Sequence, residues 1–293
     1  MKSRLMTAHA LSRLRWAARD ALLVEAPREK AAMARALQDG LSTATPESGA
    51  KAGNDMATDS GVHPPPDVPG RPVHPRLVDP RDLARRNVAT LEGRCVMLHA
   101  IAHIEFNAIN LALDAVARFD GMPLDFYRDW IKVAAEEGYH FTLLADHLAY
   151  LGSAYGAYPA HDGLWEMALR TKDDVLARMA LVPRTLEARG LDAAPPIRAK
   201  LAAAGDTVAA GILDIILRDE VGHVAIGNRW YRWLCTRSGR DPVGYYAVLA
   251  RDYRAPRQHG PFNIAARKAA GFDDAEIAAL TQMAEAGGES AIK

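Results

Sequence analysis

Apolar residues recur at every third or fourth position over long stretches of the chain, which is the spacing of one face of an α-helix. Ala and Leu dominate these stretches, and no segment alternates apolar and polar residues as a half-buried strand does. The pattern predicts an all-α protein. Its four longest predicted helices cover residues 90–119, 123–151, 163–189 and 197–237. Helices of this length in one chain usually pack along each other, so we expect a four-helix bundle within residues 83–238.

Shorter segments flank the predicted bundle. Residues 8–41 predict one or two short helices, and residues 42–82 are rich in Pro, Gly, Ser and Asp, which predicts an extended strap whose end docks on the main body. The Pro195-Pro196 pair predicts a stop between the third and fourth long helices, and Gly205-Asp206 a break in the fourth. Residues 239–293 predict a C-terminal extension with helices at 242–252, 263–270 and 273–286. The expected division is therefore 1–82, 83–238 and 239–293.

Two Glu-x-x-His pairs lie within the long predicted helices, at Glu137/His140 and Glu220/His223. Residues three apart on a helix are surface neighbours, so each pair can present a carboxylate and an imidazole to one point. Both pairs fall on apolar stripes, which predicts that they are buried. Burying an unpaired carboxylate costs several kcal/mol, about 3 or more, unless it is paired or binds a metal.

Two further glutamates extend this pattern. Glu105 is the acidic residue on the apolar stripe of the first long helix, and Glu187 is an acidic residue on the third, where Pro183 is expected to kink the helix. Two Glu-x-x-His pairs plus one Glu from each of two other helices form the ligand set of a dinuclear carboxylate centre in ferritin-like bundles. The predicted metal ligands are Glu105, Glu137, His140, Glu187, Glu220 and His223.

For other polar residues near these positions, the sequence predicts a role less specifically. A single Glu-x-x-His is more often an ordinary hydrogen-bonding pair, and the case here depends on the recurrence. His99 and His103 share a face of the first long helix and could bind a metal together, although they are better read as polar-face residues or partners of the ligands. The candidates for residues that orient the ligands or line a substrate pocket are His103, Tyr139, His161, Asp219 and Tyr231.

Four segments resemble a bacterial family of ferritin-like proteins of unknown function: residues 98–105, 135–140, 184–192 and 218–223. That family is loosely similar to the di-iron monooxygenase that hydroxylates a modified adenosine in tRNA. The resemblance covers roughly residues 75–270 and implies the ferritin-like fold and all six ligand positions, including Glu187. It implies no substrate. Gly138 and Tyr139 depart from the family motif, which more often has Arg or a bulkier residue there.

Carboxylates with two histidines suit two Fe ions, with Mn next. The predicted function is activation of O2 or peroxide, with a monooxygenase or hydroxylase first and a rubrerythrin-like peroxide reductase second. Iron storage ranks third, since a cage subunit is usually shorter. A helical protein that binds metal without catalysis, or holds no metal, and an RNA-associated protein are alternatives from other classes.

Charge and cysteine content indicate which partners and which cellular compartment to expect. The chain has 36 basic and 36 acidic side chains among 293 residues, so no net charge draws it to nucleic acid or membranes. Cys95 and Cys235 lack metal-ligand spacing and are expected to be reduced, which favours the cytoplasm. No apolar run suggests a signal peptide or membrane span. The expected partners are a small-molecule or modified-nucleoside substrate, an external electron donor and a second copy in a homodimer.

Overall fold

A computed structural model describes residues 8–43, 63–83 and 87–289. Within these ranges the chain is all-α, as the sequence predicts, and contains no β-strand. Two compact units divide it, Met1–Asp162 and Gly163–Lys293. The three-part division expected from composition stays a prediction, and so does the ferritin-like type of bundle.

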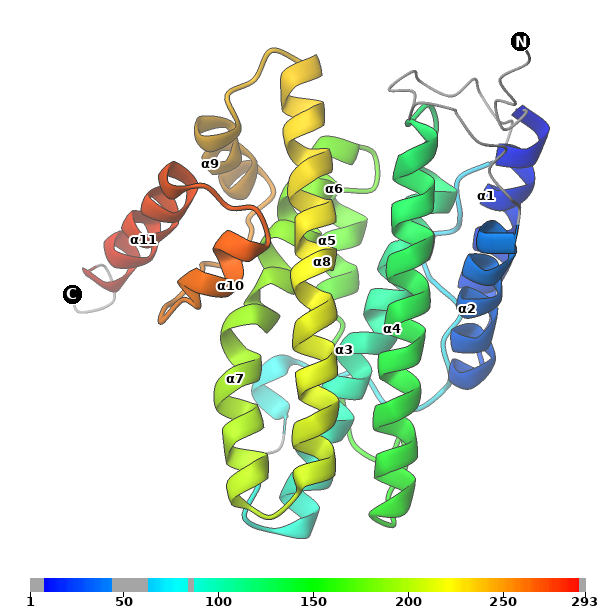
Figure 1. Cartoon of the computed structure of the whole chain (residues 1–293), viewed down its shortest axis with the longest axis vertical. Helices are drawn as coiled ribbons and strands as arrows, with labels where there is room; N and C mark the ends of the chain where they lie inside the picture. Colours follow the sequence, from blue (N-terminus) through cyan, green and yellow to red (C-terminus); the bar gives the residue numbers. More distant parts are fainter. Residues whose placement is uncertain (1–7, 44–62, 84–86, 290–293) are drawn as a thin grey trace. The chain divides into compact units, whose positions relative to one another are not determined.

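Four α-helices lie in the described part of the first unit (Figure 1). They are α1 (Ala8–Leu23), α2 (Pro27–Thr43), α3 (Leu91–Arg118) and α4 (Leu124–Tyr150). The long helices α3 and α4 pack against each other, α2 packs on α4, and α1 packs on α3. A Cβ atom at Gly138 would lie 2.9 Å from the carbonyl oxygen of Ala31, so the absence of a side chain there lets α2 approach α4 closely.

The α3 helix begins where the pattern predicts, because the Thr90 hydroxyl accepts a hydrogen bond from the Gly93 amide at 3.0 Å and caps the first turn. By length and composition this helix would pass as a membrane span, although the sequence showed no continuous apolar run. In the structure 78% of its most apolar window is buried, and a core helix passes the same test.

The predicted strap lies partly outside the described residues, which resume at position 63. Residues 63–79 have no helix, and a single 3₁₀ turn follows at Pro80–Asp82. The end of this segment docks as expected, because the Val78 amide donates to the Ala160 carbonyl at 2.8 Å. Lys30 anchors the same segment at Gly70. Its ammonium group donates to the carbonyls of Leu22 and Gly70 and to the side chain of Asn110.

The second unit is built from shorter helices around one long helix (Figure 1). Its elements are α5 (Gly163–Arg170), α6 (Val175–Leu181), the π-helix η2 (Val182–Glu187), α7 (Ala188–Ala203), α8 (Thr207–Arg237), α9 (Pro242–Asp252), α10 (Ile264–Ala269) and α11 (Asp274–Glu289). Both α7 and η2 pack along α8, and α9 packs on α6.

The prediction of one continuous helix over residues 163–189 is wrong. The chain turns between α5 and α6, where Asp174 caps the new helix by accepting from the amides of Leu176 and Ala177. Pro183 then lacks the N–H that an α-helix needs, and the chain forms the π-helix η2. The Thr185 hydroxyl donates to the Ala180 carbonyl at 2.8 Å and satisfies one of the acceptors in this segment.

The predicted stop at Pro195-Pro196 is also wrong, because α7 continues through both prolines to Ala203. Pro195 cannot donate to the Leu191 carbonyl, which would otherwise be left without its helical partner. The side-chain amide of Asn263, at the start of α10, donates to that carbonyl at 3.2 Å. The long helix predicted at 197–237 therefore begins at Thr207, after a turn at Gly205-Asp206, where the sequence suggested a break.

Candidate metal centre

In the first unit, α3 and α4 bring Glu105, Glu137 and His140 together. All three side chains are buried, with Glu137 and His140 fully so. Each offers one ligand atom, and these atoms lie within 4.8 Å of one another. The register of α4 explains the pairing on that helix, because Glu137 and His140 are three residues apart and share a face. These residues could hold a metal ion.

The charges in this cluster are strongly coupled. Burial of the imidazole opposes its charged form, but the two carboxylates outweigh burial and raise the pKa of His140 to about 11. The Nδ1 atom lies 3.1 Å from Glu105 Oε2 and 3.4 Å from Glu137 Oε2. Two buried carboxylates this close require a positive charge beside them, and a divalent cation would supply it more fully than one imidazolium.

In the second unit, α8 carries the other Glu-x-x-His pair. His223 is fully buried and Glu220 nearly so. His223 Nδ1 and Glu220 Oε1 are 3.7 Å apart, as expected for residues that share a helical face. This second carboxylate–imidazole pair matches the first in composition and in burial.

Glu187 is the last residue of the π-helix η2, and it is buried. The sequence left this residue uncertain, because a kink at Pro183 would alter the direction of its side chain. The structure replaces the kink with a π-helical segment that ends at Glu187. Short π-helical segments of this kind often occur at functional sites.

The donors in these groups fit a metal of intermediate hardness. Carboxylate oxygens and imidazole nitrogens suit divalent ions such as Fe(II), Mn(II) and Zn(II), whereas Cu(I) is more commonly bound by sulfur. Cys95 and Cys235 are both buried free thiols, and neither belongs to the groups described above.

His103 contacts the loop that follows α4, at the side chain of Tyr155 and at the backbone of His161. His103 Nδ1 is 2.9 Å from the Tyr155 hydroxyl, and its Nε2 is 3.2 Å from the His161 carbonyl oxygen. The neighbouring His99 accepts a hydrogen bond from the Gly156 amide at 2.9 Å. Burial lowers the pKa of both His99 and His103 to about 4, so both rings are neutral and fix the loop after α4 to α3.

The other three pocket candidates each contact a different partner. Tyr139 is 38% exposed and lies under the guanidinium of Arg35. Asp219 pairs with Arg218 at 2.8 Å. Tyr231 is buried and donates to the Pro242 carbonyl at 2.7 Å, and burial raises the pKa of its phenol. Each of these contacts lies within one unit, and the predicted roles of the three side chains at a substrate pocket stay predictions.

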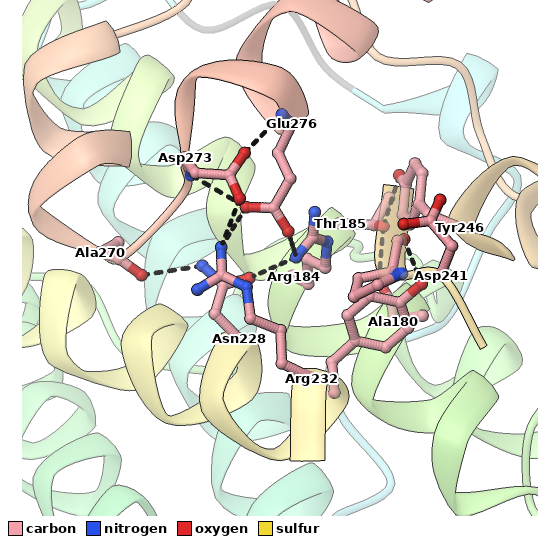
Figure 2. A network of polar contacts seen from close by, with 12 residues as sticks. Ala180, Arg184, Thr185, Asn228, Arg232, Asp241, Tyr246, Ala270, Asp273 and Glu276 are labelled. Atoms are coloured by element: carbon pink, nitrogen blue, oxygen red, sulfur yellow. Dashed lines mark hydrogen bonds and ion pairs between the residues drawn. The ribbon is translucent and has the colours of Figure 1, made fainter. Parts of the chain in front are cut away.

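A buried polar network in the second unit was missed by the sequence analysis (Figure 2). Arg184, from η2, donates to Asn228 at 3.0 Å and pairs with Glu276 at 2.8 Å. Glu276 also pairs with Arg232, which links α11 to α8. The signal in the sequence was a single arginine directly after the apolar run 179–183, where a charged residue is expected to have a buried partner.

Comparison with known proteins places the chain in a family. Residues 23–278 match the family described as "Protein of unknown function (DUF455)". A protein of Haemophilus influenzae described as "Uncharacterized protein" is 51% identical over 213 residues, which cover 70% of this chain and 74% of that protein. No solved structure matches the chain. The chain belongs to the DUF455 family.

Proposed function

We propose that this protein is a di-metal oxidoreductase with a ferritin-like helical bundle, and that the six ligands predicted from its sequence hold two iron ions. The observation that carries the proposal is the buried group of Glu105, Glu137 and His140. Two carboxylates and an imidazole gathered on two packed helices are costly for a core unless they bind a cation. The buried pair on α8 and the buried Glu187 supply further ligands of the same kinds.

Iron is favoured over manganese because the ligand set includes two imidazoles along with carboxylates. When bound, a pair of iron ions would supply the redox chemistry needed to activate O2 or peroxide. The protein's part is to fix the ligands and limit access of water. On α4 the fully or nearly fully buried side chains of Val133, Phe141 and Leu144 surround the ligand positions and provide an apolar setting.

Within this class we propose a monooxygenase or hydroxylase. The substrate would be a small molecule or a modified nucleoside, and an external protein would deliver the electrons. Two cysteines in the whole chain are too few for a rubredoxin-type iron site, which needs four thiolates. This count favours the monooxygenase over a peroxide reductase with its own electron-transfer module.

Metal stoichiometry tests the proposal. The purified chain is reconstituted anaerobically with Fe(II), desalted and submitted to elemental analysis, and its optical spectrum is recorded before and after exposure to O2. We expect about two iron ions per chain, with an O2-dependent band in the near ultraviolet.

Matched variants make the test specific. Glu137→Ala and His223→Ala should each lose bound iron, whereas His99→Gln should retain it, because His99 is engaged with the Gly156 amide. Normal iron content in both ligand variants would sink the assignment. One metal per chain would keep the metal site but rule out the dinuclear chemistry.

A further inference from the structure

The second unit contains a pocket of about 400 Å³, within the usual size range of small-molecule sites. None of the six predicted metal ligands lines it. Its walls come from η2, α9, α10, α11 and the segment before α10. Most of the lining is apolar, with Phe272, Leu280 and Met283 prominent, and its polar groups include Arg184, Arg267 and Gln258.

The two arginines are unusual for a pocket wall because both are buried. The guanidinium of Arg184 lies over the rings of Tyr231, Tyr246 and Phe272, at 4.9, 5.4 and 4.8 Å from their centroids. Arg267 lies over Phe272 at 5.4 Å and pairs with Asp192 through Nε and Nη2. Stacking and ion pairing therefore hold both guanidinium groups in fixed orientations.

Both arginines have N–H groups without an acceptor among the described residues. A guanidinium has five N–H groups, and Arg184 uses only Nη1, toward Asn228 and Glu276 (Figure 2). Its Nε and Nη2 atoms make no hydrogen bond within residues 8–43, 63–83 and 87–289. Arg267 Nη1 likewise has no acceptor in those ranges.

The carboxylate that lines the same pocket is already engaged. Glu276 pairs with Arg184 through Oε1, and its Oε2 pairs with Arg232 and accepts from the Asp273 amide (Figure 2). Two guanidinium groups and one carboxylate thus line the pocket, and the uncommitted polar atoms of these three side chains are donors. A complementary ligand brings acceptors, preferably with negative charge, on an apolar body.

We propose that this pocket binds a small apolar monocarboxylate, with its carboxylate on the free N–H groups of Arg184 and Arg267 and its hydrocarbon body against Phe272, Leu280 and Met283. Planar guanidinium groups suit a carboxylate because they can donate two parallel hydrogen bonds. The proposal is independent of the metal centre, since it uses none of the metal ligands.

Calorimetric titration of the full chain tests this, with octanoate as the probe and 1-octanol and octylamine as matched compounds. We expect one octanoate per chain, bound at least about tenfold more tightly than 1-octanol, because charge-assisted hydrogen bonds contribute about 1.4 kcal/mol or more. Octylamine should bind more weakly still. Equal affinity for octanoate and 1-octanol, or tighter binding of octylamine, would overturn the proposal.

Two variants on one helix locate the binding. Ala279 lines the pocket, whereas the adjacent Ala278 is exposed and does not. Ala279→Phe should weaken octanoate binding by about tenfold or more, and Ala278→Phe should leave it unchanged. Arg184→Gln should abolish the preference for octanoate over 1-octanol. Octanoate binding that survives Ala279→Phe unaltered would place the ligand elsewhere and refute the assignment, even where Arg184→Gln fails to fold.

Discussion

Lys30 shows how one residue can join three segments of the first unit. Its side chain is completely buried, and its ammonium group donates to the end of α1, to the strap at Gly70 and to Asn110 on α3. Lysine is rarely buried this fully unless its donors are all used. Nothing in the local sequence marks it, because its acceptors come from residues 8, 40 and 80 positions away.

Replacement of this lysine should therefore be costly. Lys30→Met keeps the apolar stem but leaves the three acceptors without their donor, so we expect a loss of about 2–4 kcal/mol in the free energy of unfolding. Urea denaturation measures the change. The control is Lys132→Met, because Lys132 is half exposed and pairs with Glu136 on the surface. A loss no larger than in the control would show that the three contacts do not stabilise the fold.

The same residue predicts a pH dependence. Burial, and next the charge of Arg71, lower the pKa of Lys30 from 10.5 to about 7. Between these values the unfolded chain binds more protons at this site than the folded chain, so the contribution of Lys30 to stability rises with pH. The slope is at most about 1.4 kcal/mol per pH unit. The stability difference between wild type and Lys30→Met should grow from pH 7 to pH 9, and a constant difference would contradict the lowered pKa.

At the scale of elements, the close contact between α8 and η2 depends on Gly227. A Cβ atom there would lie 2.6 Å from Cβ of Pro183, whose ring cannot rotate away. Gly227→Ala should cost about 1–3 kcal/mol in the free energy of unfolding, although alanine is the better helix former. Gly211→Ala, on the same helix with nothing within 4 Å of the added atom, should instead stabilise by about 0.5–1 kcal/mol. Thermal denaturation of the two variants tests this. Equal shifts in melting temperature would mean that η2 moves to accommodate the added Cβ atom.

The long helices could be predicted where local signals agree with packing. α3, α4 and α9 lie within one or two residues of the ranges read from apolar periodicity, and in the structure Thr90 and Asp241 cap α3 and α9. The boundary between the third and fourth predicted helices was misplaced for a nonlocal reason. Proline at 195 and 196 normally ends a helix, but Asn263, far along the chain, supplies the missing donor. No local reading of residues 190–197 contains that information.

The same distinction applies to the sites. Glu137/His140 and Glu220/His223 were predictable because the spacing of each pair is a property of one helix, and their burial follows from the stripe around them. The Arg184 network was not, because its members come from η2, α8 and α11, and each looks like an ordinary charged residue in its own segment. Hydrophobic periodicity identifies which face of a helix is buried. It does not identify the side chains of other elements that contact a charged residue on that face.

At the scale of the whole molecule, metal binding and folding should be linked. A metal that binds the folded chain alone stabilises it by RT ln(1 + [M]/Kd), about 2.7 kcal/mol at a free concentration of 100 Kd. The anaerobic chain should therefore unfold at a higher temperature as Fe(II) is added, and a chelator should reverse the shift. Calorimetry at several Fe(II) concentrations measures this, with Mg(II) as the control for nonspecific ionic effects.

Ligand variants from the two units distinguish how the six residues cooperate. If all six serve one dinuclear centre, Glu137→Ala in the first unit and His223→Ala in the second should each remove most of the Fe(II)-dependent shift, because a dinuclear site that loses one ligand binds both ions weakly. If the shift survives in His223→Ala but vanishes in Glu137→Ala, the group of Glu105, Glu137 and His140 binds metal by itself. Two bound ions would then no longer be expected, and the protein would be better described as a mononuclear metal-binding protein than as an oxygen-activating enzyme.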